Sequence, residues 1–151
     1  MSNKIYIDKK TYNNVVPLSA IKHITSFREQ RTINNDRIKL IQKIFETKLK
    51  KNKFTSFNFS TPLIFIKTSD NILLNKNNIR TNVCIVDGQH RLNALIKLQQ
   101  KYKKIDRLNI PILVHNVNSI DEADKIQYEL FEQKPFSDAD KIKQGDYNIN
   151  F

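Results

Sequence analysis

Short apolar runs separated by polar turns predict the strands of this chain. Residues 14–18 contain Pro17, which cannot donate to a neighbouring strand and therefore confines this strand to a sheet edge or a strand end. Residues 71–82 are rich in turn formers and predict a hairpin tip leading into the apolar run from Val83. The predicted strands are residues 3–8, 14–18, 61–66, 83–86 and 110–115.

Apolar residues at helical spacing predict the helices. Asp36 is available as the N-cap of the first helix, and Ser119, which acidic residues follow, as the N-cap of the third. The second helix ends in lysines, which suit the negative end of its dipole. The predicted helices run from 35–36 to 49, from the turn at 88 to 101, from 119 to 131 and from 137 to 145.

The length of 151 residues fits a single domain, which we place at residues 1–151. The one cysteine, Cys84, excludes an internal disulfide, and no cysteine and histidine cluster has zinc-site spacing, so no metal centre is predicted. This cysteine usage fits a reducing compartment, and no apolar segment is as long as a signal peptide or a membrane span. We therefore expect a soluble, cytoplasmic protein without a membrane partner.

The net charge of +11 is concentrated in two lysine clusters. Basic clusters of this kind predict a polyanionic partner, for which DNA is the first candidate. An Asn-, Lys- and Ile-rich composition is also typical of an AT-rich genome, in which case the lysines only solvate the surface. The lysines assigned to nucleic-acid binding are Lys48, Lys50, Lys51, Lys53, Lys101, Lys103 and Lys104.

An apolar run that halts at Asp87-Gly88 and continues as a helical pattern predicts a strand, a one-glycine turn and a helix start. Glycine adopts a positive φ without steric cost and lets a ligand approach the backbone. Backbone N–H groups and the positive end of the helix dipole would then point outward beside His90 and Arg91. This arrangement suits a phosphate or another anion.

Each side chain at this junction also has a structural interpretation. Asp87 is a helix cap, a metal ligand or a base. His90 donates to a phosphate or is a partly buried ring bonded to a carbonyl. Arg91 opposes the helix dipole and needs an anion, which is either a ligand phosphate or an internal carboxylate such as Asp87. Gln89 suits a base, a ribose or a phosphate.

Other catalytic motifs do not occur in the sequence. There is no Walker loop, no dinucleotide-binding glycine motif, no nucleophile elbow and no zinc-protease helix. Nothing indicates a triad among His23, His90 and His115, which are far apart in the sequence. Cys84 lies inside an apolar strand, which favours a buried structural thiol.

The sequence Asp-Gly-Gln-His-Arg at a strand-to-helix turn resembles the DGQHR-domain proteins. This DndB-like family belongs to the superfamily that includes ParB-type partition proteins and sulfiredoxin. The resemblance covers most of residues 15–145. Beside the motif, the similar segments are residues 30–38, 62–66, 110–114, 130–132 and 135–137.

The resemblance implies an α/β (α+β) fold, a compact single domain with a small mixed sheet and flanking helices. It also implies that the Gly-x-His-Arg turn binds the phosphates of a nucleoside triphosphate, ATP or CTP, with Mg²⁺ held through the substrate's own phosphates. The residues implied for phosphate binding are Gly88, Gln89, His90, Arg91, Gln30, Arg31 and Arg37, and those implied for catalysis are Asp87, His90 and Arg91.

The expected function is therefore that of a nucleotide-binding domain in DNA metabolism or defence, with NTP hydrolysis and DNA cleavage as candidate reactions. The alternatives are a non-enzymatic DNA-binding or scaffold protein that uses the same basic cleft, and a degenerate family member without a ligand. Gln89 stands where sulfiredoxin needs a reactive cysteine, so we do not expect peroxiredoxin repair. Because ParB-type proteins add further regions after this domain, we expect a reduced form from a virus or mobile element. The preferred nucleotide and homodimer formation are left open.

Overall fold

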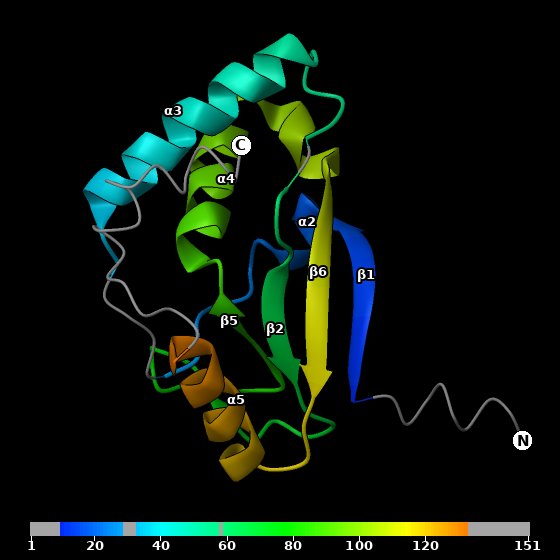
Figure 1. The fold of residues 1–151 in the computed structure, drawn as a ribbon, viewed down its shortest axis with the longest axis vertical. Coiled ribbons are helices and arrows are strands. Elements are labelled where there is room, and N and C mark those ends of the chain that lie inside the picture. The colour runs from blue at the N-terminus through cyan, green and yellow to red at the C-terminus, as the bar shows by residue number, and fades with distance from the viewer. Residues whose placement is uncertain (1–9, 29–32, 58, 133–151) are drawn as a thin grey trace, which may run out of the picture.

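The structure, a computed structural model, describes residues 10–28, 33–57 and 59–132 (Figure 1). The predicted strand at 3–8 and the predicted helix from 137 lie outside the described residues. The strands are β1 (Thr11–Pro17), β2 (Leu63–Lys67), β3 (Leu73–Leu74), β4 (Arg80–Thr81), β5 (Val83–Asp87) and β6 (Asn109–Asn116). The helices are α2 (Leu18–Ile21), α3 (Asn35–Lys51), α4 (Gln89–Lys101), the 3₁₀ helix η1 (Lys103–Arg107) and α5 (Ile120–Glu132).

The main sheet has the strand order β1-β6-β2-β5 and is mixed. Strand β6 pairs antiparallel with β1 and parallel with β2, and β2 pairs antiparallel with β5. The pairing of β1 extends to Thr11 opposite His115, so β1 begins earlier than the predicted start at residue 14. Strands β3 and β4 form the predicted hairpin as a separate sheet. The expected fold class, α/β with a small mixed sheet and flanking helices, is confirmed.

The two faces of the sheet are covered by different helices. Side chains alternate between the faces along a strand. Phe65 packs in the core that holds Phe45 of α3 and Leu95 of α4, whereas its neighbour Ile66 packs in the core that holds Ala123 of α5. Each large apolar side chain buried in this way contributes about 1.5–3 kcal/mol to stability. The sheet is therefore fixed from both sides, with α3 and α4 together on one of them (Figure 1).

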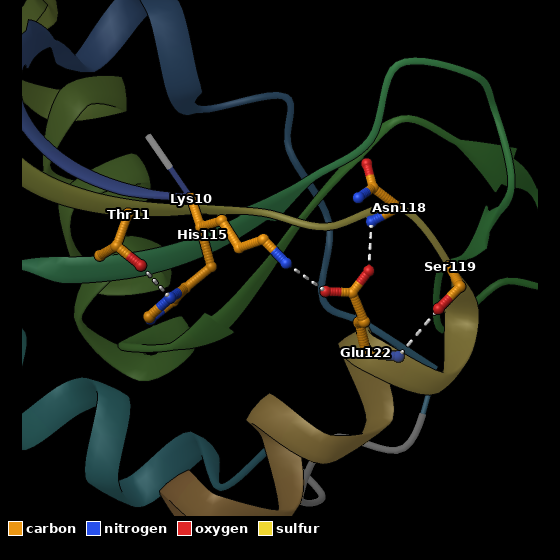
Figure 2. Close-up of polar contacts among 6 residues, drawn as sticks. All are labelled: Lys10, Thr11, His115, Asn118, Ser119 and Glu122. Carbon is orange, nitrogen blue, oxygen red and sulfur yellow. Dashed lines mark hydrogen bonds and ion pairs between the residues drawn. The ribbon is translucent and has the colours of Figure 1, made fainter. Parts of the chain in front are cut away.

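The helix caps correct one sequence prediction and confirm another. Helix α3 is capped by Asn34, whose Oδ1 accepts a hydrogen bond from the Arg37 N–H at 3.1 Å. The prediction of Asp36 as N-cap is wrong, because the extended backbone that a cap requires occurs at Asn34 and Asp36 lies within the first helical turn. Helix α5 is capped by Ser119 as predicted, since Ser119 Oγ accepts from the N–H of Glu122 at 3.2 Å (Figure 2).

Helices α3 and α4 lie side by side and run in the same direction (Figure 1). Near their starts, the backbone N–H of Asn34 donates to Nε2 of His90 at 3.1 Å. Towards their ends, Nζ of Lys101 donates to Oε2 of Glu46 at 2.9 Å. The two helix N-termini therefore meet at one end of the helix pair and the two C-termini at the other. Among the described residues, no helix is long and apolar enough to cross a membrane.

Candidate functional site

The turn between β5 and α4 depends on Gly88 for two reasons. Gly88 adopts φ +95°, in the left-handed region that favours glycine. A Cβ atom at this position would also lie 2.5 Å from Cδ2 of Leu63, which is fully buried. The N-cap position of α4 is thus occupied by a residue that has no side chain for capping. This glycine is required by packing as well as by backbone conformation.

The side chains that follow Gly88 turn into the protein. Oε1 of Gln89 accepts a hydrogen bond from the hydroxyl of Ser26 at 2.7 Å, and both residues are buried. Nε2 of His90, also buried, accepts the backbone N–H of Asn34 at 3.1 Å. A ring nitrogen that accepts in this way carries no proton, so His90 in this state cannot donate to a phosphate from Nε2.

Arg91 connects the start of α4 to the residues that precede β2. Its Nη1 donates to the carbonyl of Thr61 at 2.7 Å and to the Thr61 hydroxyl at 3.1 Å, and its Nη2 donates to the carbonyl of Pro62 at 3.4 Å. Nη2 also lies 3.9 Å from Oδ2 of Asp87 in an ion pair whose side chains are only 13% and 15% exposed. Burial lowers the pKa of Arg91, and the charge of Asp87 partly offsets that effect. The guanidinium is held close to the protein and stays charged.

Arg37 brings a second positive charge to the same place. It is the third residue of α3, just as Arg91 is the third residue of α4. The charge of Arg37 adds to the effect of burial in lowering the pKa of Arg91. Asp36, in the same turn of α3, is exposed, and the carboxylate that acts on Arg91 is that of Asp87.

The start of α3 and the start of α4 therefore form one positive centre, which we call the helix-start cluster: Asn34, Arg37, Asp87, Gly88, His90 and Arg91. Each helix N-terminus contributes about half a positive charge. The two guanidinium groups add two positive charges, the Asp87 carboxylate removes one, and the exposed Asp36 carboxylate in the same turn of α3 removes another, so about one positive charge is left. A positive excess of this kind favours an anion such as a phosphate group. Gln30 and Arg31, the other residues implied for phosphate binding, lie outside the described residues.

The lysines assigned to nucleic-acid binding lie at the opposite end of the same helices. Lys50 and Lys51 end α3, Lys101 ends α4, and Lys103 begins η1. Helix α4 has 13 residues, so about 20 Å separates the lysines from Gly88. The structure thus brings the two lysine clusters together, but it does not bring them to the Gly88 turn.

The described residues contain no group of three or more His, Cys, Asp and Glu side chains that could hold a metal ion. Cys84 is buried in β5, as the sequence predicts, and burial raises the pKa of its thiol to about 12. Such a thiol stays protonated and is a poor nucleophile.

Several partners of the site residues were not found by sequence reasoning. Ser26 binds Gln89 and Thr61 binds Arg91, each from a segment that is distant in the sequence. No local sequence pattern predicts these contacts. Asn34 had a signal, because asparagine is among the best N-cap residues and precedes the helix. Glu46, which lies between the two lysine clusters, could have been found as the one acidic residue among the lysines near the end of α3.

Comparison with known proteins finds no relative for this chain: no protein-family model matches it, and no curated protein or solved structure is similar to it.

Proposed function

We propose that the chain binds the phosphate group of a nucleotide, with ATP and CTP as the first candidates, at the helix-start cluster. The observation that carries this function is the convergence of two helix N-termini with Arg37 and Arg91, beside the carboxylate of Asp87. Resemblance of the motif to DGQHR-domain proteins points to the same ligand. It also supports a role in DNA metabolism or defence.

The electrostatic argument is specific to the position of the two arginines. A cation in the first turn of a helix opposes the helix dipole, at a cost of about 0.3–1 kcal/mol at an exposed site. Arg37 and Arg91 both occupy this unfavourable position, and they also repel each other. A bound phosphate would relieve both effects and would accept charge-assisted hydrogen bonds.

We assign different tasks to the two arginines. Arg91 is held by the carbonyls of Thr61 and Pro62, so it fixes the turn and contributes its charge. Arg37 lies on the first turn of α3 and is partly exposed, which makes it the residue to contact the ligand. Mg²⁺ would be bound mainly through the phosphates of the nucleotide.

Hydrolysis of a nucleotide would require a change in the hydrogen bonds of the helix-start cluster. His90 accepts a backbone N–H at Nε2, and that bond would have to break before Nε2 could carry a proton. Asp87 faces Arg91 and is the carboxylate of the cluster that could orient water. The proposed function is therefore binding, with NTP hydrolysis as the reaction to be assayed once binding is measured.

The test is isothermal titration of the chain with ATP, CTP, GTP and inorganic triphosphate, with and without Mg²⁺. Arg37→Gln should weaken binding by about 10-fold or more, because a hydrogen bond to a charged group is worth about 1.5–3 kcal/mol. Lys39→Gln is the matched control, since Lys39 lies on the same helix, is exposed and carries the same charge. Equal losses in both variants, or no binding by the wild-type chain at millimolar nucleotide, would contradict the proposed function.

A further inference from the structure

The far end of α3 and α4 carries a dense positive surface, which we call the lysine surface. Its centre is Oε2 of Glu46, which lies 2.9 Å from Nζ of Lys101 and 3.8 Å from Nζ of Lys50 and also accepts the hydroxyl of Tyr102. These contacts lower the pKa of Glu46 and outweigh the opposite effect of burial, which raises it. The lysine surface consists of Lys48, Lys50, Lys51, Lys53, Lys101, Lys103 and Lys104.

The lysines lie at the ends of α3 and α4, where packing and hydrogen bonds fix the backbone. The rings of Phe54 and Tyr102 lie 4.4 Å apart and join the end of α3 to the end of α4. Phe54 N–H donates to the carbonyl of Leu49 at 2.8 Å, which ends α3 in a tight turn where Lys53 and Phe54 both have positive φ. Nζ of Lys104 lies 4.8 Å from the centre of the Phe54 ring. The backbone that carries the lysines is therefore fixed at the ends of both helices.

The charge of this surface far exceeds what the fold needs. Lysines near a helix C-terminus are stabilising, because each C-terminus carries about half a negative charge. Among the residues that the structure describes, two C-termini and Glu46 together balance about two of the seven lysines, which leaves about five positive charges. Asp106 of η1 does not reduce the excess, since it is paired with Lys22 at 3.1 Å. Burial lowers the pKa of Lys48, and the charge of Lys51 lowers it further.

We propose that the lysine surface binds the phosphate backbone of duplex DNA, as a second anion site that is separate from the helix-start cluster. A regular row of phosphates is the partner that can neutralise several fixed lysines at once, with release of counterions. The surface has no features for reading base sequence, so binding should be independent of sequence. This inference adds a second ligand to the proposed function and does not depend on nucleotide binding.

Two observations favour duplex DNA over other polyanions. Single-stranded nucleic acid is bound by open aromatic faces on which bases stack, whereas the face of Phe54 is covered by Lys104 and Tyr102 has Lys101 above it at 5.3 Å. An anionic membrane is usually bound with the help of exposed apolar anchors. Among the described residues, the exposed large hydrophobic side chains are Val15, Ile79 and Tyr128, all outside the lysine surface.

The experiment measures binding of the full chain to a fluorescent 20-base-pair duplex by anisotropy between 50 and 300 mM NaCl. The variant replaces Lys50, Lys51 and Lys103 by Gln, and all three residues are exposed. We expect the affinity at 50 mM NaCl to fall about 10-fold or more, and the slope of log K against log salt to become shallower by about 2.7 when all three lysines contact phosphates. The control replaces Lys67, Lys76 and Lys125 by Gln, which removes the same charge from exposed residues elsewhere in the chain.

Two further arms separate the outcomes. Arg37→Gln should lose nucleotide binding and retain DNA binding, so failure of one site leaves the other testable. Equal loss in both triple variants would show that net charge alone governs DNA binding and would overturn the assignment of this surface. No duplex binding at 50 mM NaCl would overturn it as well. Stronger binding to phosphatidylserine vesicles or to a 20-nucleotide single strand than to the duplex would replace duplex DNA by that partner.

Discussion

The backbone N–H of Asn34 donates to Nε2 of His90 at 3.1 Å, and this bond joins the start of α3 to the start of α4. The same asparagine caps α3 through its side-chain oxygen. Asn34 thus serves one helix with its side chain and the other with its backbone. These two hydrogen bonds hold together residues of the helix-start cluster that are distant in the sequence.

The first prediction concerns the cap of α3. Asn34→Ala removes the side-chain acceptor for the Arg37 N–H but leaves the backbone donor to His90, so we expect a loss of about 1 kcal/mol in the free energy of unfolding. Asp36→Ala should change it by no more than about 0.5 kcal/mol, because Asp36 is exposed within the first turn. Urea titration of both variants measures the difference. A larger loss in Asp36→Ala would restore Asp36 as the capping residue.

The second prediction concerns the contact between Gly88 and Leu63. Gly88→Ala should destabilise the fold by about 2–4 kcal/mol, because it combines a left-handed φ with a Cβ placed 2.5 Å from Cδ2 of Leu63. Leu63→Ala alone should cost about 2–5 kcal/mol through the cavity that it leaves. The double variant should lose less than the two single losses added together, since truncation of Leu63 makes room for the new methyl group. Strict additivity would show that the backbone conformation alone demands glycine.

The third prediction separates the charge of Arg91 from its hydrogen bonds. Arg91→Lys keeps the positive charge but cannot reach the Thr61 and Pro62 carbonyls in the same forked geometry. We expect a loss of about 1–2 kcal/mol in stability. Arg37→Lys should be nearly neutral for stability, because the structural anchor lies at Arg91. Equal stability of Arg91→Lys and wild type in urea titration would count against an anchoring role.

The fourth prediction is a pH dependence that arises at His115. Burial lowers the pKa of this histidine, while the charge of Glu129 partly opposes the shift. The unfolded chain then takes up a proton more readily than the folded one, so the contribution of His115 to stability is present above its unfolded pKa of about 6.5 and is lost as the pH falls through that value. Nδ1 of the ring lies 3.0 Å from the Thr11 hydroxyl (Figure 2).

The measurement is urea unfolding at pH 7.5 and pH 5.5 for the wild type, His115→Asn and Glu129→Gln. His115→Asn should show a smaller loss of stability between the two pH values than the wild type. Glu129→Gln should show a larger loss from His115, because the opposing charge is gone. A loss that is unchanged in His115→Asn would assign the pH dependence to other groups.

The fold could be predicted from the sequence wherever the signal is local. Short continuous apolar runs located β2, β5 and β6, and the serine at 119 followed by acidic residues located the start of α5. The glycine at position 88 located the turn, since a positive φ and a close neighbour both select that residue. These features depend on chain conformation that nearby residues determine.

The orientation of the site's side chains could not be predicted in the same way. Whether Gln89 and His90 face outward depends on Ser26 and Asn34, which approach from other parts of the chain. The distance of Lys101 from Gly88 follows from the length of α4, but the position of the α3 lysines at the same end follows from the parallel course of the two helices, about which composition carries no information. The residue types predicted clusters of positive charge. Only the three-dimensional arrangement showed that these clusters lie at opposite ends of the helix pair α3 and α4.

The parallel pair α3 and α4 is fastened near both ends, by Asn34 with His90 at one and by Glu46 with Lys101 at the other. Helix α4 cannot unravel from either end, nor α3 from its start, without breaking a bond to the partner helix. The pair should therefore open as one cooperative unit, in which the slowest amide hydrogens of both helices exchange with solvent through the same rare opening event.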